Sequence, residues 1–333
     1  MTRRPATNTT TSGEALSDTA GVANAADQVT KGLWLGLLGI VIFSVTLPMT
    51  RLAVGTPDAP QMSGLFIAMA RAVVAAGLSA ALLLATRAPL PARKDWRALV
   101  ITAGGVVFGF PLLTSIAMRH VEAMHASVIV GVLPLATAAV GALLHRQRPS
   151  IGFWLCAGLG SALVVVFAVM RSGDAGGART ISFADLLLLA AMLCAAVGYC
   201  YGGRLAGHMR AEHVICWALV ISLPITLPLS IYSWPAQTIK PTAWWGFAYV
   251  AVFSMWLGFF AWYRGLALGG TVRVSQVQLV QPFLSMLFAI ALLGEKLDAV
   301  TVGFGLTVIA SVFIGKKMPV GSAARTLPLN KKV

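Results

Sequence analysis

The chain has 333 residues, of which 58% are hydrophobic and 11% are charged, and its mean hydropathy is +0.82. Soluble proteins carry about 25% charged residues, so this composition excludes a soluble domain of this size and predicts an integral membrane protein. The net charge of +14 would favour nucleic-acid binding in a soluble protein. In a membrane protein such an excess reflects orientation and contact with lipids, and no nucleic-acid partner is expected.

Residues 1–31 are rich in Thr, Ala and Asp and predict a disordered cytoplasmic tail. Ten apolar runs of about the 20 residues that cross a bilayer follow. They cover residues 32–51, 62–85, 98–118, 123–144, 150–170, 183–203, 213–233, 243–263, 272–293 and 298–316. The predicted fold is therefore all-α, with ten transmembrane helices, and residues 318–333 form a basic cytoplasmic tail.

The second half of the chain repeats the first. One offset of 148 residues maps Ser127 onto Ser275, Pro134 onto Pro282 and the polar turn at Gln147 onto Glu295. Because five spans is an odd number, the second half enters the membrane from the opposite side. The sequence predicts two inverted five-helix repeats, 32–172 and 183–317, joined by a periplasmic linker at 173–182, which is typical of alternating-access carriers.

Basic residues indicate the orientation. With both termini in the cytoplasm, 18 of the 25 Lys and Arg residues lie on the cytoplasmic side and 6 on the outer side, while Arg71 alone lies inside a span. This bias follows the positive-inside rule. We expect a multi-pass protein of the bacterial inner membrane with both termini inside.

Several segments resemble the drug/metabolite transporter superfamily, EamA type, over about residues 33–316. They include the end of the first span, Phe43-Ser-Val-Thr-Leu-Pro-Met-Thr-Arg51, the arginine of the second span, Arg71, the alanines that close spans three and eight, Ala117 and Ala267, and Pro282 with the later Leu292-Leu-Gly-Glu-Lys-Leu297. The resemblance implies the ten-span fold with two EamA repeats and a transport activity. It leaves the substrate open.

Arg71 lies near the middle of its span, where a charge costs at least about 2.5–3.5 kcal/mol. It should therefore face the interior of the bundle or water. Two roles stay open: binding a carboxylate or phosphate of a substrate, or capping carbonyls of a broken helix.

Span nine carries Gln278 and Gln281 on one face, with Ser275 preceding them, and span eight carries Trp256 and Phe260. Packing between helices would explain these residues as well as a cavity would. As a cavity, they predict a pocket between spans three, four, eight and nine, with Phe108 and Ser127 contributed by the first repeat. Helix breaks are expected at three prolines, Pro48, Pro134 and Pro282. Tyr199, Tyr201 and Tyr263 read as anchors at the membrane interface.

His120, Glu122 and His125 cluster at the start of span four without the spacing of metal ligands, and the four cysteines form no CxxC. The sequence predicts no metal and no cofactor. His125 is a weak candidate for a pH-sensitive gate against an ordinary interfacial cluster. No carboxylate is expected at mid-membrane, which predicts weak or indirect ion coupling, by facilitated diffusion or exchange.

These features favour a secondary transporter, not an enzyme, that exports small metabolites or amphipathic compounds by alternating access. A membrane-embedded enzyme would need clustered catalytic side chains at one depth, and a channel gains nothing from inverted duplication. Both remain alternatives. The expected partners are a small-molecule substrate and membrane lipids, and homodimer formation stays open.

Overall fold

The computed structural model describes residues 11–144, 148–174, 182–269, 274–296, 298–317 and 320–321. Their elements in the first half are α1 (Thr11–Ser44), α2 (Thr46–Val54), α3 (Gly64–Ala85), η1 (Arg93–Asp95), α4 (Trp96–Ala103), the π-helix η2 (Gly104–Gly109), α5 (Phe110–Ala117), α6 (Ala123–Val130), α7 (Leu133–Leu144), β1 (Arg148–Pro149) and α8 (Ile151–Asp174). The second half has α9 (Phe183–Ala206), α10 (Ala211–Tyr232), α11 (Pro241–Tyr249), the π-helix η3 (Val250–Leu257), α12 (Gly258–Gly269), the 3-10 helix η4 (Ser275–Val280), α14 (Gln281–Leu293), α15 (Ala299–Lys317) and β2 (Val320–Gly321).

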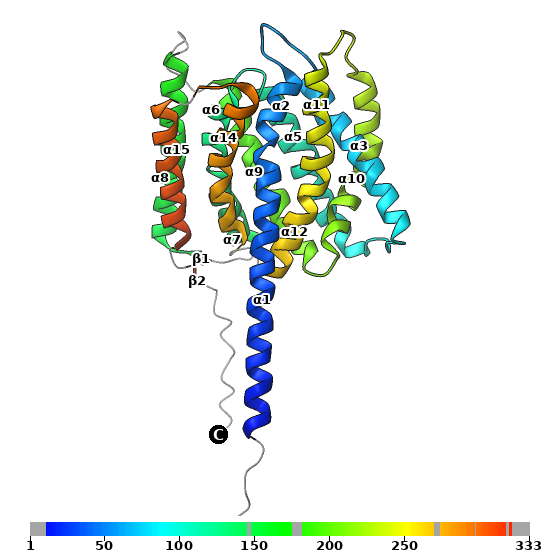
Figure 1. Cartoon of the computed structure of the whole chain (residues 1–333), viewed down its shortest axis with the longest axis vertical. Helices are drawn as coiled ribbons and strands as arrows, with labels where there is room; N and C mark the ends of the chain where they lie inside the picture. The colour runs from blue at the N-terminus through cyan, green and yellow to red at the C-terminus, as the bar shows by residue number, and fades with distance from the viewer. Residues whose placement is uncertain are drawn as a thin grey trace, which may run out of the picture.

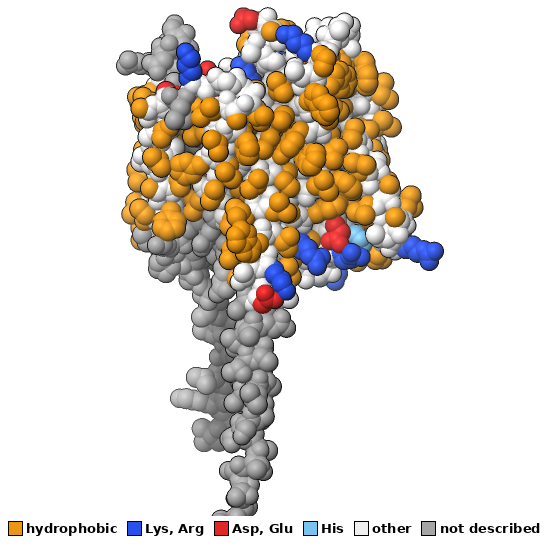
Figure 2. Space-filling view, in the orientation of Figure 1, with side chains coloured by type: hydrophobic (Ala, Val, Ile, Leu, Met, Phe, Trp, Pro, Cys, Tyr) orange, Lys and Arg blue, Asp and Glu red, His pale blue; other side chains and the backbone are white. Residues whose placement is uncertain are grey.

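The helices form the predicted all-α membrane fold. In the described residues, seven helical segments are long and apolar enough to cross a membrane, and two shorter apolar segments, Val277–Leu293 and Ala299–Ser311, follow. With the 24-residue α8, these segments account for the ten predicted spans, and the predicted all-α fold is confirmed. Figure 2 shows a broad apolar belt on the face of the bundle in view, with the charged side chains gathered at its two edges.

Helix α1 begins at Thr11, earlier than the predicted start at residue 32, and its first half projects from the bundle (Figure 1). The residues that precede the apolar run include several alanines, which are the strongest helix formers, so the helix continues into the predicted tail. Of the tail at 318–333, the structure describes only Val320 and Gly321, which pair with Pro149 and Arg148 as β2 and β1.

Helix packing follows the internal repeat. Span 1 (α1) packs along span 8 (α12), and span 6 (α9) packs along span 3 (α4, η2 and α5). Span 2 (α3) contacts span 7 (α10), span 4 (α6) contacts span 9 (α14), and span 5 (α8) contacts span 10 (α15) at one edge of the bundle (Figure 1). A two-fold axis that relates each span to the span five places later generates this set of contacts.

Glycines bring the helices of these interfaces close together. A Cβ at Gly32 of α1 would lie 2.5 Å from the backbone nitrogen of Gly269, and one at Gly265 would lie 2.7 Å from that of Gly36. In the related interface, a Cβ at Gly105 would meet the carbonyl oxygen of Cys194. Close backbone approach through small residues is a common way for membrane helices to associate, since lipid tails supply no hydrophobic driving force between them.

The connections between the helices lie at the two ends of the bundle, which we call the terminal face and the far face. The terminal face holds the connections at 86–92 and 207–210, and the far face holds those at 55–63, 118–122, 233–240 and 294–298. The long projection of α1 leaves the bundle at the terminal face (Figure 1).

Candidate functional site

A small cavity lies inside the bundle between the two repeats. The first repeat contributes Phe43 and Thr46 of span 1, Arg71 of span 2, Val106 of span 3 and Val130 of span 4. The second repeat contributes Tyr199 of span 6, Ser254, Met255 and Phe259 of span 8, and Gln281 of span 9. The cavity measures about 20 Å³, room for about one water molecule. The cavity is therefore too small in this structure to hold a metabolite.

The cavity lies where the spans depart from regular α-helix. Span 1 breaks at Val45 between α1 and α2, three residues before Pro48. Span 4 breaks between Val130 and Leu133, just before Pro134, and span 9 is a 3-10 helix up to Val280, two residues before Pro282. Irregular backbone inside a membrane occurs where it is buried in protein or lines a cavity.

The prolines leave carbonyl groups without their helical donors. A proline has no N–H, so the carbonyl four residues earlier loses its partner. For Pro134 that residue is Val130, which lines the cavity, and for Pro282 it is Gln278, whose carbonyl accepts instead from the Gln281 N–H. At the break in span 1, the Tyr249 hydroxyl donates to the Ile42 carbonyl at 2.9 Å, and the Ser44 hydroxyl donates to that of Ile40 at 2.7 Å.

Arg71 is the charged group of this cavity. It is 1% exposed, and its Nε and Nη1 have no hydrogen-bond partner among the described residues. A buried guanidinium with unmade hydrogen bonds is costly, because each unsatisfied donor loses its water without compensation. Such donors can bind an anion, and guanidinium geometry suits carboxylate and phosphate oxygens.

Aromatic rings form one wall beside this cation. The Phe43 ring stacks on Tyr199 with centroids 6.4 Å apart, and it lies 5.1 Å from the ring of Phe259. The Thr46 and Ser254 hydroxyl groups, which also line the cavity, form a hydrogen bond of 2.8 Å between spans 1 and 8. The cavity thus combines one cation, a few hydroxyl and amide groups and an apolar wall, which is the usual makeup of a small-molecule site.

The cavity holds two of the eight residues predicted to bind substrate, Arg71 and Gln281. Phe108, Trp256 and Phe260 are half-buried outside its lining, and the Trp256 and Phe260 rings pack on each other at 4.9 Å. The Ser127 hydroxyl donates to the Ala123 carbonyl of its own helix at 2.7 Å. Gln278 is 1% exposed, and neither polar atom of its amide has a partner in the described residues. The Ser275 side chain is outside the described part.

The structure adds residues that the sequence left out. The pocket extends beyond spans three, four, eight and nine to spans one, two and six. Tyr199 and Tyr263 are buried in the bundle, which corrects their interpretation as interface anchors. The Tyr263 hydroxyl donates to the Gly198 carbonyl at 3.4 Å, and Tyr199 lines the cavity. No sequence signal separates a buried tyrosine from an interfacial one near a helix end, because both lie in apolar surroundings.

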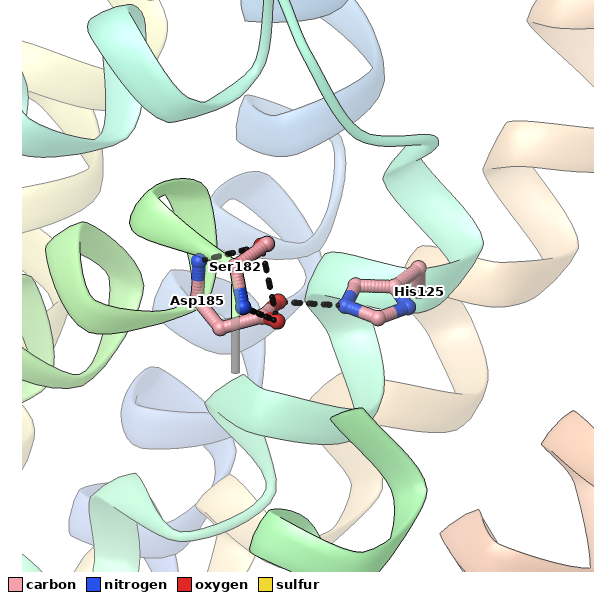
Figure 3. A network of polar contacts seen from close by, with 3 residues as sticks. All are labelled: His125, Ser182 and Asp185. Atoms are coloured by element: carbon pink, nitrogen blue, oxygen red, sulfur yellow. Dashed lines mark hydrogen bonds and ion pairs between the residues drawn. The ribbon is translucent and has the colours of Figure 1, made fainter. Parts of the chain in front are cut away.

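His125 belongs to a second buried polar cluster, toward the far face. Its Nε2 lies 2.7 Å from Asp185 Oδ1, and the two side chains are 8% and 1% exposed (Figure 3). Asp185 also accepts from the backbone N–H and the hydroxyl of Ser182, which together cap the start of α9. The sequence grouped His125 with His120 and Glu122 and did not indicate Asp185 as its partner.

Glu295 links the repeats at the far face. Gly294 ends α14 in the left-handed conformation, with φ of 68°. The next residue, Glu295, accepts hydrogen bonds of 2.8 Å from the backbone N–H groups of Ala123 and Met124, which begin α6. A carboxylate at a helix N-terminus satisfies free donors and interacts favourably with the helix dipole.

These features define a multi-pass membrane protein whose two related halves enclose a polar centre. The chain belongs to the EamA-like transporter family, which matches residues 30–169 and again residues 182–315. This membership confirms the predicted family and its transport function.

Known proteins support the same conclusion. The uncharacterized transporter YdeK of Bacillus subtilis (strain 168) is 41% identical over 295 residues, which cover 87% of this chain and 99% of that protein. The uncharacterized transporter YyaM of the same organism is 22% identical over 56% of this chain and 62% of its own. One solved crystal structure shares the fold, with a TM-score of 0.58 and 17% identity over 86% of this chain and 96% of that one.

Proposed function

We propose that this transporter is a secondary carrier that exports small metabolites or amphipathic compounds across the bacterial inner membrane by alternating access. In this proposal both termini are cytoplasmic, so the terminal face is the inner side and the far face the outer side. The substrates favoured by the site carry an anionic group and an apolar body. We propose export as the direction of transport because the chain resembles drug/metabolite transporters.

The observation that carries the proposal is the Arg71 guanidinium, whose Nε and Nη1 have no partner among the described residues, in a small cavity lined by both repeats. A cavity with room for about one water molecule must enlarge to hold a metabolite, and residues of both repeats wall it. Movement of one repeat against the other would enlarge it and expose it on one side, as in other carriers built from inverted repeats. The breaks in spans 1, 4 and 9 supply backbone that can bend.

An enzyme or a channel is less well supported by these residues. The cavity brings together an arginine, hydroxyl groups, an amide and aromatic rings, without a nucleophile paired with a base as acyl or phosphoryl transfer requires. A channel needs a continuous wet path, whereas this cavity has a volume of only about 20 Å³.

The test begins with an unbiased comparison of metabolites inside and outside cells with and without the protein. A compound that the protein moves to the medium names both substrate and direction. The purified protein should then exchange that compound across proteoliposome membranes, while liposomes of lipid alone do not. Chemical conversion of the compound would establish an enzyme, and unitary currents in single-channel recordings would establish a pore. Either result would overturn the proposal.

A further inference from the structure

The His125–Asp185 pair joins the two repeats near the far face. His125 lies in the first turn of α6 in span 4, and Asp185 lies in the first turn of α9 in span 6. The ion-pair distance is 2.7 Å, and both side chains are more than nine-tenths buried. Any motion that separates the far ends of spans 4 and 6 must break this contact.

Both carboxylate oxygens of Asp185 have polar partners, which favours the ionised form. Oδ2 accepts from the Ser182 backbone N–H and hydroxyl, and Oδ1 faces His125 Nε2 (Figure 3). The positive end of the α9 dipole favours the same charge. Histidine is the side chain suited to gain and lose a proton near neutral pH, so the imidazole is the group considered for the exchangeable proton.

The surroundings of the pair are apolar on the side of spans 5 and 10. The His125 ring lies 5.0 Å from that of Phe167 in α8, which in turn lies 5.4 Å from Phe304 in α15. The charged or titratable groups that neighbouring elements place at the same end of the bundle are Arg51 in α2, Arg119, His120 and Glu122 between α5 and α6, Glu295 and Lys296 after α14, and Asp298 before α15. Both carboxylate oxygens of Glu295 already accept hydrogen bonds from the backbone N–H groups of Ala123 and Met124.

We propose that the His125–Asp185 pair is a proton-binding site whose protonated form holds the far ends of spans 4 and 6 together. With His125 protonated, the buried pair is neutral overall. With His125 neutral, the closed structure holds a net negative charge away from water, which is unfavourable. Loss of the proton therefore favours a conformation in which the far ends part and water reaches Asp185. The inference rests on the proposed alternating access and adds a proton as its regulator.

The sign and size of the effect follow from linkage. If one proton binds more tightly to the closed form, the ratio of open to closed molecules rises with pH. This ratio rises by at most about tenfold per pH unit, and it rises only at pH values between the pKa of the site in the open form and its pKa in the closed form. Low pH on the far side closes that end, and high pH opens it.

Hydrogen–deuterium exchange on the full-length protein in nanodiscs tests this without a known substrate. Exchange of peptides covering 123–130 and 183–190 is measured from pH 5.5 to 8.5 and corrected for intrinsic chemistry. In the wild type, corrected exchange of both peptides should rise several-fold with pH. In His125→Gln, which keeps a hydrogen-bond donor but cannot gain a charge, the pH dependence should vanish. In Asp185→Asn, exchange should stay low throughout.

A matched control is available at the terminal face. His208 Nε2 lies 3.1 Å from Asp95 Oδ1, but its side chain is about half exposed. His208→Gln should leave the pH response of α6 and α9 unchanged. A flat wild-type profile, a profile that survives His125→Gln, or one that His208→Gln abolishes would each overturn the proton site. Transport that persists in proteoliposomes alongside a flat profile would reject the proton site and leave the carrier function standing.

Discussion

Phe108 and Trp256 occupy the same position in the two repeats, 148 residues apart, and each lies within a π-helical segment. The paired segments are η2 in span 3 and η3 in span 8, and both place residues in the cavity, Val106 from the first and Ser254 and Met255 from the second. π-Turns are uncommon and often occur at functional sites. Their occurrence at matching places indicates that the duplication preserved the distortion as well as the helices.

Arg71 is the residue whose replacement should separate binding from folding. Arg71→Lys keeps the charge but loses the forked donor geometry, so transport of an anionic substrate should fall but persist. Arg71→Ala should reduce transport at least about tenfold, since a charge-assisted hydrogen bond contributes about 1.5–3 kcal/mol. The measurement is initial exchange rate in proteoliposomes at equal protein content, with Arg97→Ala, at an exposed position, as the control.

The folded state of Arg71→Ala decides between the two roles of the arginine. A monodisperse protein with a melting temperature at or above that of the wild type supports substrate binding, because removing an unpaired buried charge relieves its desolvation cost. Aggregation of Arg71→Ala, or failure to insert, would instead favour a structural arginine.

Gly265 should not tolerate a methyl group. A Cβ there would lie 2.7 Å from the Gly36 nitrogen and 2.9 Å from the Gly32 carbonyl oxygen, both backbone atoms that cannot turn away. Gly265→Ala should therefore destabilise the protein by about 1–3 kcal/mol. The control is Gly77→Ala in α3, where nothing lies within 4 Å and where alanine should stabilise the helix slightly. Melting temperatures in one detergent compare them, and equal shifts would contradict the close packing of spans 1 and 8.

Glu295 should make stability depend on pH. Burial raises the pKa of its carboxyl, and the charge of Glu122 acts in the same direction, against the lowering by the Ala123 and Met124 N–H groups and by Arg51. A raised pKa means that folding favours the protonated form. Its stabilising contribution is full below the ordinary Glu value of about 4.3 and is lost as pH rises through the folded value.

Two substitutions check this interpretation of Glu295. Glu295→Gln keeps one acceptor without a charge, so its free energy of unfolding should lose that pH dependence. Glu295→Ala leaves both N–H groups of α6 without their acceptor and should destabilise the protein by about 1 kcal/mol. Unfolding is followed in mixed micelles from pH 4 to 8. Wild-type pH dependence in the glutamine variant would show that another group titrates.

The orientation proposed for the chain rests on its basic residues and can be tested directly. With 18 of 25 on one side and 6 on the other, a reporter fused after Val333 should be active only where it works in the cytoplasm. A green fluorescent fusion and an alkaline phosphatase fusion give opposite signals, so the pair forms its own control. Phosphatase activity at this position would reverse the inner and outer sides assigned here.

The sequence by itself determined the spans, the repeat and the family. A bilayer of about 30 Å demands about 20 apolar residues, and a backbone without water must form helices, so both properties are local and can be read from composition. The two repeats appear as one offset because duplication preserves spacing. The start of α1 at Thr11 was missed because alanine-rich sequence is compatible with a helix even where its composition suggests disorder.

Only the tertiary structure decided which polar residues meet. A span surrounded by lipid and by other apolar helices carries no strong amphipathic signal, so nothing local tells which side of α9 holds Tyr199 or which residue pairs with His125. The π-helical segments also shift the angular position of the residues that follow. Val106, Ser254 and Phe259 line the cavity, whereas Phe108 and Trp256 do not, and Asp185, 60 residues from His125 in the chain, is its partner.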